Sequence, residues 1–457
     1  MQKEKTETGF NQNTFFDFEE KYNLFSKQSD GLFYWDLIRF ELFYHLLWNH
    51  KSNVKSEESA VTKRQIFDEI KSFFVFILFK KPDFLFFTSS RNMIDKDKFF
   101  DQNLGDILNN IRGSYCAFET FERNKSKWYY QNTLFNPIAI FKKITKIFYQ
   151  QKKDYSELIS LINAEFSNSA FTSEDINRLI LDFKIDCLYY SVIFKFKKPK
   201  AIFITQNGIQ KGLFAAAKER NIPIVEVQHG IIDDAHLAYN YSKKIDYIKN
   251  QIYLPTYFFS FSDFWAKDLN FPIKEIISMG NSYFFNAQYS KNKNKSVNGL
   301  LVASSDVFGE NLKKIVIDFV NINKTIPVYF KLHPNQFVEK QYYIDQFANF
   351  ENVKVYTNEN SVYELLEISK AILVIQSTAL YEAYHLKKIA FIYKKQTYRR
   401  HEHVFDLPNI NLINNANEIV EAYDKEFVID DLSENLFFKN FDSYKFDQFV
   451  GNSLLVN

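Results

Sequence analysis

The segment IPIVEVQHG, residues 222–230, joins a run of β-branched residues to a polar Gln-His-Gly turn. A short apolar run of this kind is typical of a strand buried in a parallel sheet, and the turn then falls at the carboxyl end of that strand. The segment KAIFITQNG, residues 200–208, has the same form, and a stretch of helical length separates the two. The order strand, helix, strand predicts a βα unit of a parallel sheet.

The same alternation extends outward from these two segments. On the N-terminal side it includes DFLFFTSSR (83–91) and SYCAFET (114–120). A second series is expected to begin near residue 276, and its runs are ISMGN (277–281), GLLVASSD (299–306), IPVYFKLHPNQ (326–336), NVKVYTNEN (352–360), AILVIQSTA (371–379) and KIAFIYKK (388–395). Two successive series predict an α/β protein with two Rossmann-like, doubly wound domains that face across a cleft.

These patterns divide the chain into four expected parts. Residues 1–80 form a helical N-terminal extension, residues 81–254 the first Rossmann-like domain and residues 255–425 the second. Residues 426–457 are an acidic, Phe-rich tail that we expect to pack back on the first domain.

Composition excludes several classes of protein. The 457 residues carry 57 Lys and Arg against 55 Asp and Glu, so the chain lacks the basic excess of a general nucleic-acid binder. Cys116 and Cys187 stand in separate segments, which disfavours a disulfide scaffold or a zinc site and suits a reducing cytoplasm. The polar start of the chain does not resemble a signal peptide, and the longest apolar run, residues 73–79, is too short to span a membrane. We therefore expect a cytoplasmic protein that does not bind nucleic acid.

The Gln-His-Gly turn supplies the first candidate catalytic residue. His229 would lie at the carboxyl end of a strand, where its imidazole can act as a general base near neutral pH. Asp233 and Asp234 could orient that imidazole or act as the base themselves; alternatively, the histidine only caps a turn and the carboxylates only favour a helix start. Gly230 is expected to permit a tight turn. The other residues expected to face the cleft are Gln228, Gly230 and His236.

The second series carries candidate phosphate-binding residues at the same end of its strands. Lys331 and His333 follow the strand 326–330, and Pro334 ends it, so a cation and an imidazole are available to an anionic diphosphate. Ser377 and Thr378 begin the next helix, where they are more often caps than ligands. Further candidates in this domain are Glu382, one turn later and within reach of a ribose, and Ser304 and Ser305 at the end of another strand.

The sequence lacks the motifs of several other enzyme classes. It contains no HExxH and no clustered His and Cys set, so we expect no metal and no cofactor. It also contains no GxGxxG or GxxxxGK[ST], which disfavours a Rossmann dehydrogenase and a P-loop ATPase.

Residues 123–153 suggest a membrane contact. This segment holds eight basic residues and no acidic one, and aromatic residues are interleaved with them, among them Trp128, Tyr129, Tyr130, Phe141 and Phe148. Such a pattern suits peripheral attachment to the inner face of the cytoplasmic membrane through anionic lipid. The alternative is that Phe141, Ile144 and Phe148 pack into the first domain while the lysines are only solvated.

Six segments together resemble the bacterial surface-polysaccharide glycosyltransferases of the GT-B type, which act in capsule and lipopolysaccharide assembly. They are VEVQHGIIDDAHLAYNY (225–241), YLPTYFFSFSDFW (253–265), MGNSYF (279–284), YFKLHPNQ (329–336), VYELLEISKAILVIQSTALYEA (362–383) and KKIAFIY (387–393). The resemblance implies that the first domain binds the acceptor and the second the nucleotide sugar. It implies phosphate contacts from His333 with Lys331 and from Ser377 with Thr378, and a base at His229.

The chain also departs from two relatives of that family. Teichoic acid enzymes of the CDP-glycerol type have Arg before the His-Pro turn and a Ser-Ser pair, where this chain has Lys331 and Ser377-Thr378. Sialyltransferases pair the His-Pro turn with two acidic residues and Gly, whereas Ala235 follows Asp233 and Asp234 here. Neither donor is therefore favoured.

The function expected from the sequence is sugar transfer from a nucleotide-activated donor to a growing capsule or lipopolysaccharide glycan, free or lipid-linked. A base that activates the acceptor for in-line attack favours inversion without a metal. Two alternatives stay open: a nucleotide-sugar 2-epimerase of similar fold, and a non-catalytic glycan-assembly protein.

Overall fold

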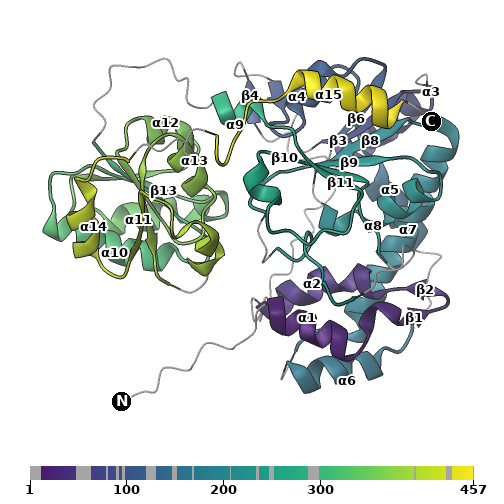
Figure 1. Ribbon diagram of the computed structural model, residues 1–457, viewed down its shortest axis with the longest axis horizontal. Helices are drawn as coiled ribbons and strands as arrows, with labels where there is room; N and C mark the ends of the chain where they lie inside the picture. The colour runs from purple at the N-terminus through teal and green to yellow at the C-terminus, as the bar shows by residue number, and fades with distance from the viewer. Residues whose placement is uncertain are drawn as a thin grey trace. The chain divides into compact units, whose positions relative to one another are not determined.

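The computed structural model gives the fold of fourteen segments of the chain (Figure 1). The described residues are 12–47, 63–78, 81–88, 92–94, 98–119, 130–146, 152–166, 169–205, 207–232, 236–245, 252–286, 298–395, 398–428 and 435–455.

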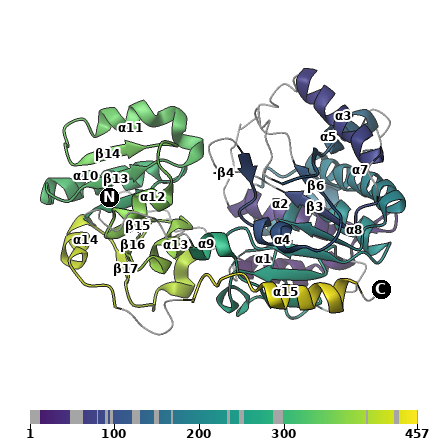
Figure 2. The ribbon, with the colours of Figure 1, turned by 90° about the horizontal axis from the view of Figure 1, so that it is seen from above.

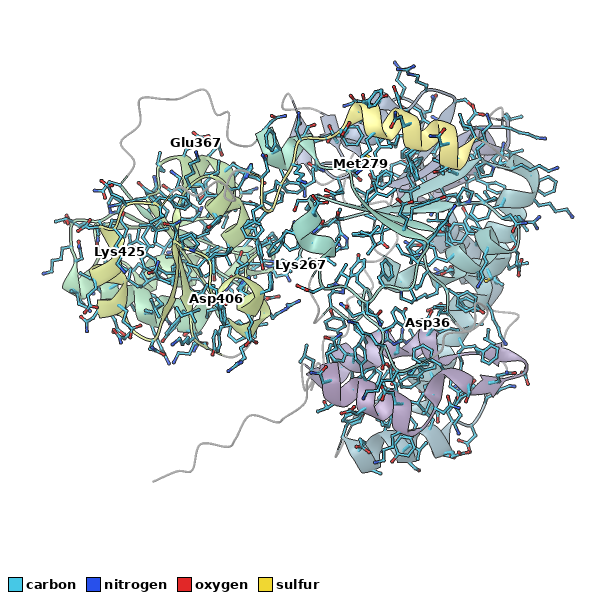
Figure 3. The ribbon with its side chains drawn as sticks, in the orientation of Figure 1. Asp36, Lys267, Met279, Glu367, Asp406 and Lys425 are labelled. Atoms are coloured by element: carbon cyan, nitrogen blue, oxygen red, sulfur yellow. The ribbon has the colours of Figure 1, made fainter. Side chains whose placement is uncertain are left out.

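The chain folds into two compact units and passes between them four times. The first unit comprises Met1–Ser260, Ala266–Met279 and Asp442–Asn457, and the second comprises Phe261–Trp265 and Gly280–Phe441. Lys267 and Met279, labelled in Figure 3, lie just inside the two ends of the middle segment of the first unit. This division differs from the expected boundary after residue 254.

The first unit is built on a seven-stranded parallel sheet with the order β11-β10-β9-β8-β3-β6-β7. Its strands are β3 (Phe84–Thr88), β6 (Tyr115–Glu119), β7 (Thr133–Phe135), β8 (Ala201–Ile204), β9 (Ile224–Val227), β10 (Tyr257–Ser260) and β11 (Glu275–Ser278). The central strands β3, β8 and β9 are buried along their whole length, which accounts for their continuous apolar runs.

One expected strand assignment is wrong. The run near residue 276 was expected to open the second domain, but β11 pairs with β10, and β10 with β9, in the first sheet. Strand pairing depends on contacts between distant segments, and nothing in the run ISMGN specifies the sheet that it joins.

Helices cover both faces of the first sheet. On one face α3 (Lys63–Leu78), α5 (Ile138–Lys146), α7 (Ser173–Lys197) and α8 (Lys211–Lys218) share a core with β3, β6 and β8 (Figure 2). On the other face Phe446 and Phe449 of α15 (Ser443–Phe449) pack against aromatic rings of β8 and β10. The remaining short elements around this sheet are α4 (Gly105–Asn110), β4 (Asn92–Ile94) and β5 (Lys98–Phe100).

A helical lobe in the same unit contains the first described helices of the chain. Its helices are α1 (Gln12–Lys21), α2 (Trp35–Leu47) and α6 (Ser156–Glu165), with a small hairpin of β1 (Gln28–Ser29) and β2 (Leu32–Phe33). Their buried aromatic and aliphatic side chains form one core with the segment 237–241 that follows the Gln-His-Gly turn.

The second unit holds a six-stranded parallel sheet with the order β14-β13-β12-β15-β16-β17. Its strands are β12 (Leu300–Ala303), β13 (Val328–Lys331), β14 (Val353–Tyr356), β15 (Ala371–Val374), β16 (Ile389–Tyr393) and β17 (Ile410–Ile413). Its helices are α9 (Ser282–Asn286), α10 (Gly309–Ile322), α11 (Lys340–Gln346), α12 (Val362–Glu367), α13 (Ala379–His385) and α14 (Ala416–Tyr423). Two Rossmann-like parallel-sheet units confirm the fold class expected from the sequence.

No helix in the described part of the chain is long and apolar enough to cross a membrane.

Candidate functional site

The strand order gives each of the two parallel sheets one point at which the order reverses. In the second sheet the chain runs outward from β12 through β13 to β14 and then from β15 through β16 to β17, so the strand order reverses between β12 and β15. Parallel α/β sheets bind ligands at the carboxyl ends of the strands beside such a reversal. Ser304 and Ser305 end β12, and Ser377 and Thr378 follow β15, so these four expected residues flank that point.

The two serines after β12 play different parts. Ser305 Oγ accepts a hydrogen bond from the Phe308 N–H at 3.1 Å and so shapes the turn into α10. Ser304 is buried, and among the described residues its hydroxyl has no hydrogen-bond partner. Because an unsatisfied buried hydroxyl is costly, Ser304 is suited to bond a ligand or a water at the reversal point.

The His-Pro turn fixes the orientation of an exposed imidazole. His333 caps the short helix η4 (Pro334–Glu339), and its Nδ1 accepts the Asn335 N–H at 3.3 Å. The Gln336 side chain accepts the His333 N–H at 3.2 Å, which completes a capping box. With Nδ1 used as an acceptor, the neutral ring carries its proton on Nε2, so Nε2–H is the donor left for an anion.

The His-Pro turn and the end of β12 form one surface. The Asn335 side-chain amide donates to Asp306 Oδ2 at 2.9 Å, and the Gln336 amide donates to Tyr343 Oη at 3.0 Å. The sequence analysis passed over Asn335 and Gln336, although Gln three residues after the capping histidine is the signal of a capping box.

Gly309, at the start of α10, leaves room for that turn. A Cβ at this position would lie 2.4 Å from Gln336 Nε2 and 2.2 Å from Tyr343 Oη. We expect Gly309→Ala to push the Gln336 side chain away from its position beside His333, and thus to weaken nucleotide binding about tenfold or more, at the scale of one lost hydrogen bond. Calorimetric titration measures the change. Gly451→Ala is the matched control, because a Cβ there meets nothing within 4 Å; unchanged affinity in Gly309→Ala would contradict the role of the turn.

Lys331 is engaged differently from the sequence expectation. Its ammonium donates to the carbonyl oxygens of Thr357 and, at 2.7 Å, of Asn360, and it thereby holds the loop after β14. Burial lowers its pKa. Two of its three N–H groups are thus used within the protein, which leaves one for a phosphate.

The turn after β15 exposes one hydroxyl and carries a carboxyl behind it. Ser377 Oγ accepts the Ala379 N–H at 3.3 Å, whereas the side chain of Thr378 is exposed and caps no backbone group. Glu382, one turn along α13, contacts Tyr363, and burial raises its pKa to about 7. Tyr283 of α9 lies with its ring 6.0 Å from that of Tyr363, so two phenols surround the carboxyl.

The raised pKa of Glu382 predicts how nucleotide affinity varies with pH. An ionised carboxylate accepts hydrogen bonds from ribose hydroxyls, so binding favours the deprotonated form. We expect affinity to rise with pH up to about pH 7 and then level off, because below its pKa Glu382 must lose a proton to bind. Nucleotide titrations across pH measure the profile. Glu382→Gln should bind weakly and flatten it, and a wild-type profile that is already flat between pH 5 and 8 would remove Glu382 from the ribose contact.

Tyr381 of α13 contacts two histidines that no sequence motif indicated, one buried and one half-buried. Tyr381 Oη lies 3.0 Å from His401 Nδ1 and 3.0 Å from His403 Nε2, in the segment η5 (Tyr398–Val404) that follows β16. Burial lowers the pKa of His401 to about 3, so its ring is neutral. This contact fastens the segment after β16 to α13, directly behind Thr378.

In the first unit a buried amide shapes the turn that carries His229. The side-chain amide of Gln228 donates to the Gly230 carbonyl at 2.9 Å. The backbone N–H of Gln228 donates to the Phe259 carbonyl, also at 2.9 Å. His229 is half-buried at the end of β9. The expected role of Gly230 is wrong, because its φ lies outside the left-handed region and a Cβ would meet nothing within 4 Å.

The neighbours expected for His229 lie elsewhere or outside the described residues. The ring of His236 packs 4.8 Å from that of Tyr239 and 6.3 Å from that of Phe40, so its surroundings are those of a core histidine in the helical lobe. Asp233 and Asp234 fall outside the described residues.

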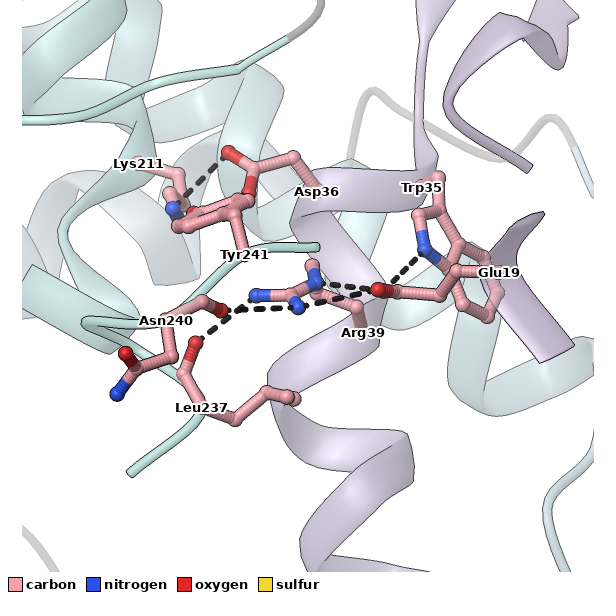
Figure 4. Close-up of polar contacts among 8 residues, drawn as sticks. All are labelled: Glu19, Trp35, Asp36, Arg39, Lys211, Leu237, Asn240 and Tyr241. Carbon is pink, nitrogen blue, oxygen red and sulfur yellow. Dashed lines mark hydrogen bonds and ion pairs between the residues drawn. The ribbon is translucent and has the colours of Figure 1, made fainter. Parts of the chain in front are cut away.

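An ion network fixes the segment after the turn (Figure 4). Arg39 of α2 bonds Glu19 at 2.7 Å and donates to the carbonyl of Leu237 at 2.9 Å. Tyr241 donates to Asp36 at 2.9 Å, and Asp36 also pairs with Lys211 at 2.9 Å. All these side chains are buried, and the network holds residues 237–241 against the start of the chain.

A buried carboxylate that the sequence analysis missed stands at the same edge of the first sheet. The strand order reverses between β3 and β8, and Thr88 and Glu119 end β3 and its neighbour β6. The Thr88 hydroxyl lies 3.0 Å from Glu119 Oε2, and both side chains are buried.

Three features bear on cofactors and on the basic segment. No group of three or more His, Cys, Asp or Glu side chains in the described part of the chain could hold a metal ion. Lys142 pairs with Asp186 and Lys146 with Asp182, each at 2.8 Å, so these two lysines of the segment 123–153 are neutralised within the protein. Residues 123–129 and 147–151 of that segment, with Trp128, Tyr129 and Phe148, lie outside the described residues.

Comparisons with known proteins show the fold. No family model matches the chain, and no curated protein matches it. Solved structures do match: S. aureus MnaA with UDP (TM-score 0.50, 13% identity, 82% of this chain and 97% of that one) and the UDP-GlcNAc 2-epimerase of Methanocaldococcus jannaschii in complex with UDP-GlcNAc and UDP (0.49, 12%, 80% and 99%). MurG of Acinetobacter baumannii is a more distant match (0.40, 8%, 73% and 86%).

Proposed function

We propose that the protein is an enzyme that acts on a nucleotide-activated sugar and binds its nucleotide in the second unit. The observation that carries this proposal is the buried Ser304 hydroxyl, which has no hydrogen-bond partner among the described residues. It follows β12, the strand that pairs with β13, and β13 leads to the exposed imidazole of His333 at the reversal of a parallel sheet. Thr378 adds an exposed hydroxyl across the reversal point, and Glu382 a carboxyl suited to a ribose. UDP is the nucleotide to test first, since it is the one bound in the S. aureus structure.

The first candidate reaction is sugar transfer to a hydroxyl of a capsule or lipopolysaccharide glycan, free or lipid-linked. His229 would take the proton from the attacking hydroxyl, and inversion follows from a single in-line displacement. The observation that favours this reaction is the half-buried imidazole at the end of β9, on a turn held by Gln228. Asp233 and Asp234 remain proposed partners of His229.

The second candidate reaction is epimerisation at C2 of the same nucleotide sugar, the activity named for the Methanocaldococcus protein and for that of Neisseria meningitidis. UDP-GlcNAc 2-epimerases of several organisms share this fold, and this favours epimerisation over transfer where the residues alone did not. An epimerase needs carboxylates near the sugar, and Glu119 supplies one at the carboxyl edge of the first sheet.

The two reactions separate in deuterated water. UDP-GlcNAc is incubated with the protein alone and followed by proton NMR. An epimerase gives the C2 epimer with deuterium at C2 and needs no acceptor, whereas a transferase leaves the sugar intact until an acceptor glycan is added. Thermal-shift measurements with UDP, GDP, CDP and CMP first identify the nucleotide, because a ligand that binds only the folded state raises its stability.

The nucleotide site itself is tested by His333→Ala and Ser377→Ala. Each lost hydrogen bond to a phosphate is worth about 1–3 kcal/mol, so we expect nucleotide affinity to fall about 5- to 150-fold in His333→Ala. We expect the affinity to fall less in Ser377→Ala, because the Ser377 hydroxyl already caps α13. Ser156→Ala, an exposed serine of the first unit, is the control. Unchanged affinity in both variants would reject the site for either reaction.

A further inference from the structure

The helix α3 turns large apolar side chains to solvent. Phe67, Phe74 and Leu78 are 66%, 60% and 84% exposed, and they recur along one side of the helix at spacings of seven and four residues. The other exposed apolar side chains of α3 are Ile70, Phe73, Val75 and Ile77. An amphipathic helix of a globular protein normally turns this face inward, so the outward face calls for an occupant.

The opposite side of α3 is anchored, so this orientation is fixed. Ser72 Oγ accepts the Phe135 N–H of β7 at 3.1 Å, and the ring of Phe76 lies 4.8 Å from that of Phe118 in β6. The helix therefore packs on the sheet through a narrow strip and cannot rotate its apolar side inward without losing these contacts.

The neighbouring helix α7 has an exposed apolar stripe of its own. Leu188, Val192 and Phe196 are exposed at a spacing of four residues. Lys197 joins the two helices at their C-terminal ends, since its ammonium donates to the Ile77 carbonyl at 3.1 Å and lies 4.6 Å from the ring of Phe76. Both helices cover the same face of the first sheet (Figure 2).

Basic residues lie along these stripes, and Asp68 of α3 is an acidic residue among them. Lys71 lies on α3, and Lys195 and Lys198 stand at the end of α7. A cavity of about 420 Å³ opens beside Lys198; its lining includes Lys200 and Arg220, and Glu219 is the one acidic residue among those that line it. The surface therefore combines exposed aromatic and aliphatic side chains with a basic margin.

We propose that this face, formed by α3 and the C-terminal half of α7, docks on an anionic phospholipid bilayer. The apolar side chains enter the boundary between headgroups and acyl chains, and the lysines meet the lipid phosphates. A second copy of the chain docked through the same face would bring these cations together, so charge complementarity favours the lipid. The proposal is independent of the reaction and differs from the contact expected through residues 123–153.

Sedimentation with vesicles tests the proposal on the full chain. We expect the protein to sediment with vesicles of equal parts phosphatidylglycerol and phosphatidylcholine, less at high salt, and to stay in the supernatant with phosphatidylcholine alone. The double variant Phe74→Ser with Leu78→Ser should lower the partition coefficient about tenfold or more, because two apolar side chains that would enter the bilayer are lost. The double variant Lys195→Glu with Lys198→Glu should weaken binding to the anionic vesicles. Both pairs are exposed, so circular dichroism should match the wild type.

Two controls sharpen the result. Val338→Ser removes a side chain that is 92% exposed in the second unit and should leave vesicle binding unchanged. Size-exclusion chromatography without lipid detects self-association. Wild-type protein that stays in the supernatant with anionic vesicles, equal binding of the Phe74/Leu78 variant, or a dimer that this variant converts to a monomer would each overturn the proposal.

Discussion

His229→Ala is expected to lower the turnover number about 10²- to 10⁴-fold while nucleotide affinity stays unchanged. The range is the usual contribution of a general base, and the separation follows because the nucleotide site is proposed in the second unit, whereas His229 lies at the end of β9 in the first.

Steady-state kinetics with the nucleotide sugar and calorimetry with UDP measure the two quantities separately. His45→Ala, which removes an imidazole at the end of α2 beside the ring of Phe171, is the control for loss of a histidine. A variant at residue 229 with near-wild-type turnover would shift attention to Asp233 and Asp234 in a transferase, or to Glu119 in an epimerase.

Arg39→Met is expected to cost about 3–5 kcal/mol of unfolding free energy in the first unit. Removing one member of a buried ion pair leaves the other charged without compensation, here Glu19, and it also leaves the carbonyls of Leu237 and Asn240 without their donor. Burial already raises the pKa of Glu19 above its usual range, and Arg39 opposes that shift. The variant should therefore hold a proton on Glu19 that the unfolded chain releases.

The pH dependence of the variant follows from that proton. When the pKa of a carboxyl is higher in the folded than in the unfolded protein, the free energy of unfolding falls as pH rises. Arg39→Met should therefore be least stable at pH 8 and regain part of the lost stability toward pH 5. Urea unfolding followed by tryptophan fluorescence measures the free energy of unfolding, and Trp35 lies within the network because it donates to Glu19 at 2.8 Å. Glu402→Ala breaks an ion pair with Arg399 that is about two-thirds exposed and should cost about 0–1 kcal/mol. A loss in Arg39→Met no larger than that of the control would contradict the role of the network.

The parts of the fold that the sequence predicted are those written in local patterns. Continuous apolar runs identified β3, β8 and β9 because strands covered on both faces need apolar side chains at every position. The polar turns at their ends located the carboxyl edges of both sheets. Local patterns could not assign β10 and β11 to a sheet, because an apolar strand of four residues fits the edge of either sheet. The pairing of β10 with β9 places both strands in the first sheet.

The candidate site was predictable to the same extent. His333 and its turn followed from an apolar run and the proline that ends it. The internal partners of Lys331, the carbonyls of Thr357 and Asn360, were not predictable because they are backbone groups with no sequence signature. Arg39 was missed for a related reason, since its carbonyl acceptors lie about two hundred residues further along the chain. The sequence alone could not show whether this arginine of an apolar helix is buried in a network or exposed to solvent.

The four passages of the chain between the units set an order of assembly during synthesis on the ribosome. Phe446 and Phe449 of α15 cover aromatic side chains of β8 and β10, yet the whole of residues 280–441 must be translated before α15 exists. At roughly 5–20 residues per second, that delay is on the order of ten to thirty seconds. During it one face of the first sheet lacks its cover while the second unit can already fold, so a nascent chain of this protein presents Phe203, Tyr257 and Phe259 to chaperones until its last helix arrives.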